Sequence, residues 1–207
     1  YDLDSLGAYA TVGHGGVVFI VEYNNVTSDY DLVFTDTTRT SNGGYNHEGN
    51  DVDGDGRPEI FIGSDQFGGL NNVAVYETTG DNSYEVSAWI EILGTGALNR
   101  RVTTGDVDGD GTEELILIDG GILLILKATK DDEYEVFWLK SFASEISVTT
   151  FDVDGDSTEE LLVGQYSPEW DGFTEIFSCN TSTSISMLPS ANTFTILDTY
   201  PNPATNR

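Results

Sequence analysis

The chain has 207 residues, of which 36 are acidic and eight are basic, so its formal net charge is −28 at pH 7. This charge excludes nucleic acid as an expected partner, because phosphates need a basic surface. No apolar run reaches the roughly eighteen residues of a membrane-spanning helix, and the single cysteine rules out an internal disulfide.

The first recognisable segment is Asp2-Leu3-Asp4-Ser5-Leu6-Gly7. It is a degenerate copy of an acidic motif that occurs three more times along the chain. Leu6 stands where the later copies have a third aspartate, so no metal ion is assigned to this copy. The chain opens at Tyr1 without an initiator methionine, a signal peptide or a capping segment. We therefore expect it to be part of a larger protein whose missing piece is N-terminal.

The first intact copy covers residues 51–59, Asp-Val-Asp-Gly-Asp-Gly-Arg-Pro-Glu, and is called loop 1. Its carboxylates stand at positions 1, 3, 5 and 9. Alternate residues of a tightly curled loop point inward, which brings hard oxygen ligands around one centre, as calcium requires. Gly56 at position 6 permits a left-handed backbone turn that a side chain would resist. The sequence therefore predicts a calcium-binding loop.

Loop 1 differs from an EF-hand, which has an acidic residue at position 12 and a helix after it. Position 12 is Ile62, and the run 60–63 is short, branched and ended by glycine, which is typical of a buried strand. Further strands are expected at residues 73–76, 84–89 and 101–105. The last of these leads into the next acidic loop.

Two more copies follow, loop 2 at residues 106–114 and loop 3 at residues 152–160, which begin 55 and 46 residues after the preceding copy. Strands are again expected after them and at residues 122–126, 134–138 and 146–151. A period near fifty residues indicates a repeat protein, and four short antiparallel strands per repeat indicate a β-propeller blade. The predicted fold is all-β, with about four blades of a larger propeller. Ser157 replaces the position-6 glycine of loop 3, so that turn is expected to be strained and its site weaker.

Positions 1, 3, 5, 7 and 9 of the three loops form the predicted metal sites, with about three calcium ions that would change the net charge from −28 to −22. Acid catalysis by carboxylate pairs is the alternative, but it requires one acid held protonated across a cleft, whereas crowded acids are tolerated once a divalent ion neutralises them. No catalytic residue is assigned. The predicted ligands are Asp51, Asp53, Asp55, Arg57, Glu59, Asp106, Asp108, Asp110, Thr112, Glu114, Asp152, Asp154, Asp156, Thr158 and Glu160.

Other candidate functional residues are few. Cys179 has no histidine arrangement to support catalysis, and His14 and His47 lie in turn-like surroundings without a zinc spacing. Trp89 and Trp138 occupy equivalent strand positions, which favours core packing over sugar stacking. For Trp170, in an expected loop, a ligand contact and a structural role remain equally open.

The blades and their loops, over roughly residues 2–178, resemble the calcium-binding FG-GAP repeats of integrin alpha-chain propellers and the related VCBS-type repeats of bacterial surface proteins. The resemblance rests on Asp-Val-Asp-Gly-Asp-Gly-x-x-Glu followed by apolar residues, although the family more often has aspartate at the ninth position. It implies four-stranded blades with one ion in each intact loop. It does not by itself imply integrin function.

The C-terminal end has a different composition. Residues 179–193 are expected to form a Ser/Thr-rich linker. The segment 194–207 contains Tyr200-Pro201-Asn202-Pro203 and resembles the start of the C-terminal sorting domain of proteins exported by the type IX system; a Pro-rich extended tail is the alternative. The expected domains are therefore blades over 1–178, a linker over 179–193 and the start of a sorting domain over 194–207.

These features predict a secreted or cell-surface bacterial protein, where extracellular calcium is abundant enough to fill weak sites. The first hypothesis is a non-catalytic module that binds a protein or glycan partner and packs against the remaining blades of the same protein. The second is the scaffold of a carbohydrate-active enzyme, such as a polysaccharide lyase, with catalytic residues outside this chain. The third is a structural subunit of an extracellular filament.

Overall fold

The computed structural model describes residues 9–14, 17–37, 42–48, 51–65, 70–93, 100–119, 121–165, 173–179 and 194–201. Within these ranges the regular structure is entirely β, as predicted, and no helix long and apolar enough to cross a membrane is found there. The strands are β1 (Tyr9–His14), β2 (Val17–Asn24), β3 (Asp29–Thr37), β4 (Asn42–Glu48), β5 (Glu59–Asp65), β6 (Leu70–Gly80), β7 (Ser83–Leu93), β8 (Arg100–Gly105), β9 (Glu114–Asp119), β10 (Ile122–Lys130), β11 (Glu133–Ser141), β12 (Ile146–Phe151), β13 (Glu160–Gln165), β14 (Phe173–Cys179) and β15 (Phe194–Pro201).

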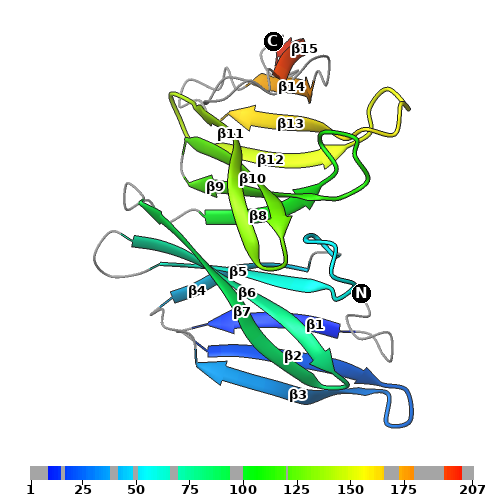
Figure 1. Cartoon of the computed structure of the whole chain (residues 1–207). Helices are drawn as coiled ribbons and strands as arrows, with labels where there is room; N and C mark the ends of the chain where they lie inside the picture. The colour runs from blue at the N-terminus through cyan, green and yellow to red at the C-terminus, as the bar shows by residue number, and fades with distance from the viewer. Residues whose placement is uncertain are drawn as a thin grey trace. The chain divides into compact units, whose positions relative to one another are not determined.

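The strands form four small sheets in chain order (Figure 1). The first has three strands in the order β1-β2-β3, and the others have four, in the orders β4-β5-β6-β7, β8-β9-β10-β11 and β12-β13-β14-β15. Neighbouring strands pair antiparallel, and hairpins with two-residue turns join β6 to β7 and β10 to β11. The strands expected after each loop, and those expected to lead into loops 2 and 3, are all confirmed.

The grouping of strands differs from the prediction by one strand. The sequence analysis took residues 101–105 and 146–151 as the last strands of their repeats, but they are β8 and β12, the first strands of their sheets. The reason is strand pairing: the strand that enters an acidic loop pairs with the strand that leaves it, as Phe151 pairs with Glu160 across loop 3. Each acidic loop therefore connects the first two strands of one sheet.

The chain divides into two compact units. The first comprises Tyr1–Val102 with Thr129–Glu133, and the second comprises Thr103–Ala128 with Tyr134–Arg207. In the first unit, fully buried side chains of β2, β5 and β6 form one core, where Phe34 makes edge contacts with Tyr76 and Tyr84 at centroid distances of 6.2 and 5.4 Å. The Tyr76 hydroxyl donates to Asp36 Oδ2 at 3.0 Å, which ties the sheet of β3 to the sheet of β6.

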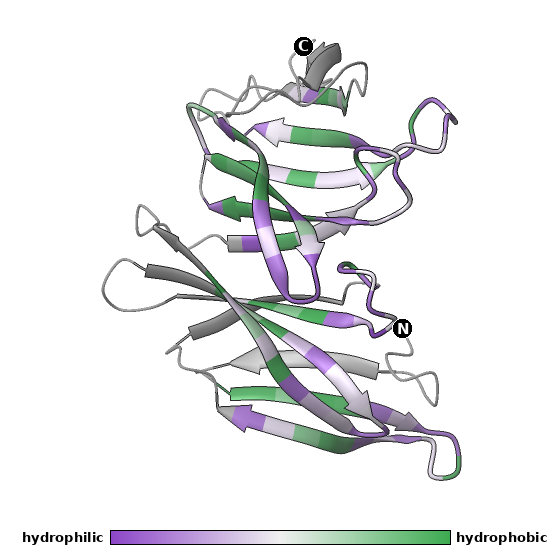
Figure 2. Ribbon diagram, in the orientation of Figure 1, coloured by the Kyte–Doolittle hydropathy of each residue, from purple (hydrophilic) through white to green (hydrophobic). Residues whose placement is uncertain are grey.

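The core of the second unit lies between its two sheets. All six residues of β9 are buried, and β9 is an inner strand of its sheet. Most of this strand is hydrophobic (green in Figure 2). Phe177 of β14 contacts Trp138 and Phe142 at centroid distances of 6.0 and 6.3 Å. Trp138 packs against this core and Trp89 packs against the core of the first unit, so both tryptophans have the predicted packing role. Trp170 lies outside the described residues.

The histidines were expected in turns, but the backbone places His14 in β1 and His47 in β4. Glycines around them suggested turns, whereas strand pairing with β2 and β5 decides the conformation. The degenerate copy at residues 2–7 lies outside the described residues.

The last sheet extends beyond the boundary expected at residue 178. Phe194–Pro201 forms β15 and pairs with β14 from Phe173↔Pro201 to Cys179↔Phe194, with one irregularity after Ile176. The segment that resembles the start of a sorting domain thus supplies the fourth strand of this sheet. Most of the expected linker, residues 180–193, lies outside the described residues.

Cys179 is the final residue of β14 and is 8% exposed, rather than part of a polar linker. Burial raises the pKa of its thiol to about 11, and the nearby carboxylates of Asp108 and Glu114 act in the same direction. We predict that a disulfide reagent at pH 8 leaves the folded chain unmodified and reacts fully once the chain is unfolded in denaturant. Rapid labelling of the folded chain would contradict the burial of this thiol.

Candidate metal centre

Loop 1 is held in shape by its own carboxylates. Asp51 accepts from the backbone N–H of Gly54 through Oδ1 at 2.8 Å and from that of Gly56 through Oδ2 at 2.9 Å. Asp55 Oδ1 accepts from the backbone N–H of Arg57 at 2.8 Å. These bonds curl the chain so that its alternate aspartates converge, as the sequence predicted.

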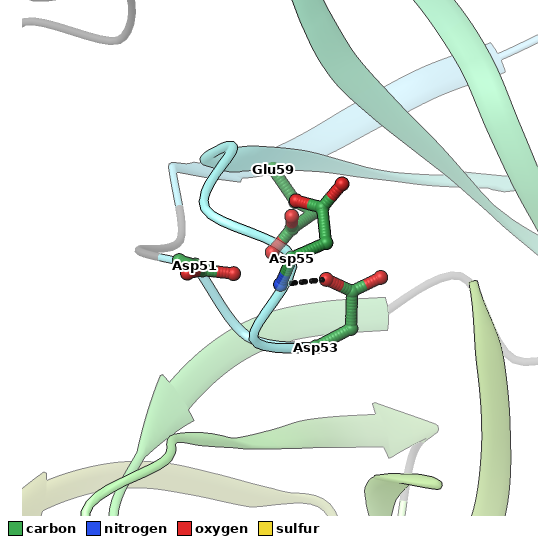
Figure 3. A group of neighbouring side chains, drawn as sticks. All are labelled: Asp51, Asp53, Asp55 and Glu59. Carbon is green, nitrogen blue, oxygen red and sulfur yellow. Dashed lines mark hydrogen bonds between the residues drawn. The ribbon is translucent and has the colours of Figure 1, made fainter. Parts of the chain in front are cut away.

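The ninth-position acid, Glu59, closes loop 1. Its Oε2 accepts from the Val52 N–H at 2.6 Å, and the side chain is 1% exposed at the start of β5 (Figure 3). The other oxygen, Oε1, is buried without a hydrogen-bond partner. Burial raises the pKa of Glu59 to about 9, and the charges of Asp53 and Asp51 raise it further. Burying a carboxylate oxygen without a hydrogen-bond partner costs free energy of folding, unless a cation binds that oxygen.

Loops 2 and 3 repeat this arrangement, with one difference: Oδ1 of the first aspartate accepts from the position-5 N–H of Asp110 in loop 2, but from the position-4 glycine in loops 1 and 3. In each loop the first aspartate accepts two backbone N–H groups, the fifth-position aspartate accepts from position 7, and the ninth-position glutamate accepts from position 2. The bonds run from Asp110, Gly111, Thr112 and Val107 in loop 2 and from Gly155, Ser157, Thr158 and Val153 in loop 3, at 2.6–3.1 Å. Repetition of one hydrogen-bond pattern at three places argues against three unrelated surface turns.

Ten of the twelve predicted acidic ligands come together. In loop 1 all four acids offer oxygens that lie within 4.8 Å of one another; in loop 2 the group is Asp106, Asp108 and Glu114, and in loop 3 it is Asp152, Asp154 and Glu160. Asp110 and Asp156 are not in these groups. At position 7, the backbone N–H groups of Arg57, Thr112 and Thr158 bond to the fifth-position aspartates.

The donor set fits a hard divalent cation. Its atoms are carboxylate oxygens, which calcium prefers, and they sit on a preformed loop with little backbone freedom left to lose. Glu59 Oε1, Glu114 Oε1 and Glu160 Oε1 are all buried without hydrogen-bond partners, and burial raises the pKa of each of the three glutamates. These orphaned oxygens are the observation that favours a bound cation over a set of solvated turns.

Sequence reasoning missed the residue that faces each ninth-position glutamate across the sheet. In loop 1 it is Glu77 of β6, directly opposite Glu59 and 3% exposed. Burial and the neighbouring Asp55 raise the pKa of Glu77 to about 7, although Arg57 opposes this shift. The Arg57 guanidinium pairs with Glu77 Oε2 at 2.9 Å and with Asp55 Oδ2 at 2.5 Å, so its side chain is a counter-ion for these two carboxylates.

In loop 2 the facing residue is Lys127 of β10, which follows Leu126 in the register Leu115↔Leu126. Its Nζ lies 2.5 Å from Asp108 Oδ2, 2.6 Å from Asp110 Oδ2 and 3.3 Å from Glu114 Oε1. Burial would raise the pKa of Asp110, but the hydrogen bonds from Lys127 and Thr112 outweigh it and lower the pKa to about 2. Glu114 is fully buried, which raises its pKa to about 7 despite the ammonium.

Two further acids, Asp131 and Asp132, belong to the same compact unit as loop 1 and lie in the turn after β10. The Asp132 N–H donates to Asp53 Oδ2 at 2.8 Å, and oxygens of Asp53, Asp131 and Asp132 lie within 4.8 Å of one another. This contact could not be predicted from the sequence, because Asp132 stands 79 positions beyond Asp53.

Ser157 has the backbone strain predicted for it. Its φ is 76°, and the glycines at the same position in loops 1 and 2, Gly56 and Gly111, have φ of 95° and 92°. Left-handed backbone costs a residue with a Cβ about 1–2 kcal/mol. We predict that Ser157→Gly raises the free energy of unfolding by roughly 1 kcal/mol and the melting midpoint by about 2–4 °C.

The matched control is Gly111→Ser, which introduces the same strain into loop 2 and should lower the midpoint by a similar amount. Differential scanning calorimetry of both variants checks the pair. A Ser157→Gly midpoint at or below that of the parent chain would show that the serine conformation is not strained.

Residues 51–117 match the family model of the FG-GAP-like repeat. The matched region begins at the first aspartate of loop 1 and includes the whole of loop 2 and most of β9. No curated protein matches the chain. The match therefore covers two of the three loops whose geometry is described above.

Proposed function

We propose that the chain is a non-catalytic, calcium-stabilised β-propeller module of a secreted or cell-surface bacterial protein, and that it mediates protein or glycan binding or assembly. The single observation that carries this proposal is the recurrence of one acidic loop geometry three times, with a buried ninth-position glutamate in each. The FG-GAP-like match over residues 51–117 supports it.

The chemistry of the loops supports a structural role for the ions. Each loop joins the first two strands of a sheet, so repulsion among its aspartates would separate those strands at their ends. A divalent ion converts this repulsion into attraction, and its binding free energy adds to the stability of the folded chain. The acids are also held in place by backbone N–H groups, which suits ion binding better than proton transfer to a substrate.

The remaining blades of a larger propeller are proposed to pack beside these sheets, and partner binding is proposed to use loops on the assembled module. This surface would be presented only while the loops are held closed. Calcium would therefore control partner binding indirectly, through the fold.

Two measurements test the proposal. Equilibrium dialysis against calcium chloride should find bound ions, and affinity electrophoresis in gels containing bacterial or algal polysaccharides should show retardation that a chelator abolishes. The same polysaccharides should not be depolymerised. A chain that binds no calcium, or that cleaves a polysaccharide, would overturn the proposed function.

A further inference from the structure

The three loops share their backbone geometry but differ in one neighbour, the residue on the next strand opposite the ninth-position glutamate. It is Glu77 in loop 1, where the register pairs Glu59 with Glu77. It is Lys127 in loop 2, one residue beyond the pair Leu115↔Leu126. It is Ser178 in loop 3, one residue beyond the pair Leu161↔Phe177. The facing side chain is thus negative, positive or neutral.

In loop 2 the ammonium lies where the carboxylates leave room for a cation. Backbone N–H groups donate hydrogen bonds to the Oδ1 atoms of Asp108 and Asp110. Lys127 Nζ contacts the Oδ2 atoms of the same two aspartates, at 2.5 and 2.6 Å. Its third close contact is an ion pair with Glu114 Oε1 at 3.3 Å, an oxygen that, like Oε1 of Glu59, is buried without a hydrogen-bond partner. An ammonium has three N–H donors, and three carboxylates surround this one.

The distances make the ammonium and a metal ion mutually exclusive. Calcium binds oxygens at roughly 2.3–2.6 Å, which is the separation of Nζ from the two aspartate oxygens. A calcium ion that bound those oxygens would have to displace the Lys127 ammonium, which is part-buried. The displaced ammonium would then have fewer carboxylates to balance its charge. Lys127 is also part of the same chain, so its ammonium binds the loop intramolecularly, whereas a calcium ion must be bound from solution.

Loops 1 and 3 lack this arrangement. Arg57 pairs with Asp55 and Glu77, and Glu59 Oε1 remains without a hydrogen-bond partner. In loop 3, Glu160 Oε1 is likewise buried without a partner, and the residue in the position of Lys127 is the uncharged Ser178. In loop 2 the equivalent oxygen, Glu114 Oε1, also lacks a hydrogen bond, but it forms an ion pair with Lys127 Nζ at 3.3 Å.

We propose that Lys127 is a built-in cation that takes the place of a metal ion in loop 2, so that the chain binds divalent ions in loops 1 and 3 only. This inference rests on the proposed function, since it assumes that the acidic loops bind calcium at all. It refines the expected number of ions from three to two. It also makes the sheet of β8–β11 the one whose acidic loop stays closed without metal.

The test counts bound calcium per chain by equilibrium dialysis and elemental analysis. The parent chain should bind two ions, and Lys127→Met, which keeps the aliphatic stem and removes the charge, should bind three. Lys130→Met is the matched control, because Lys130 is on the same strand with its side chain 66% exposed and should leave the count at two. If Lys127→Met folds only in calcium, a count of three in that folded protein still supports the proposal.

A reciprocal variant keeps the proposal falsifiable. Ser178→Lys puts an ammonium opposite Glu160 and should reduce the count from two to one, whereas Thr174→Lys, on the same strand away from loop 3, should leave it at two. Three ions in the parent chain, or two in Lys127→Met, would overturn this inference and leave the proposed function standing. No ions in any of these proteins would instead overturn the proposed function.

Discussion

Removing calcium is expected to lower the melting midpoint of the chain by roughly 10–20 °C. A ligand at one hundred times its dissociation constant stabilises the folded state by about 2.7 kcal/mol per site, so two independent sites contribute roughly 5 kcal/mol. For a domain of this size, each kcal/mol moves the midpoint by about 2–4 °C. Thermal unfolding followed by circular dichroism, in millimolar calcium and in excess chelator, measures the difference.

Ionic strength needs its own control in this experiment. The net charge of −28 means that any salt screens self-repulsion and raises the midpoint somewhat. Sodium chloride at equal ionic strength should therefore recover only a small part of the loss, and calcium should act at far lower concentration. If chelator leaves the midpoint unchanged, or if sodium chloride restores all of it, the acidic loops are not ion-stabilised.

The Glu59→Gln variant is expected to lose about half of the calcium stabilisation while remaining as stable as the parent chain in chelator. The amide oxygen can still accept from the Val52 N–H, so the closing hydrogen bond of loop 1 is kept. The substitution removes the buried oxygen that has no partner, and with it the negative charge that would bind the ion. The expected loss is one site, roughly 2.7 kcal/mol or about 5–11 °C, seen only in calcium.

This prediction separates ion binding from simple structural damage. Damage to the loop would lower the midpoint in chelator as well, whereas loss of a ligand lowers it only in calcium. Glu85→Gln is the matched control, since Glu85 is exposed on β7 and should change neither midpoint appreciably. Differential scanning calorimetry of the parent chain and both variants, in calcium and in chelator, measures these midpoints. An undiminished calcium response in Glu59→Gln would exclude Glu59 from the metal centre.

The sequence by itself predicted the acidic loops, the all-β class and the positions of the strands around each loop. These features are local. The ligand positions of a loop lie within nine residues, and backbone N–H groups of the same segment orient the carboxylates, as Asp51 shows with Gly54 and Gly56. The strain at Ser157 is local too, because a left-handed turn restricts the residue that adopts it wherever the loop lies.

Which strands share a sheet, and which side chain faces each loop, became known from the folded chain. Membership of a sheet depends on strand pairing, which placed β8 and β12 at the start of their sheets and brought Phe194–Pro201 beside β14. The charge opposite each glutamate depends on register, because a slip of one residue moves every side chain to the other face of a sheet. The positions of Glu77 opposite Glu59 and of Lys127 beside Glu114 are therefore set by strand register and could not be predicted from the loop sequences.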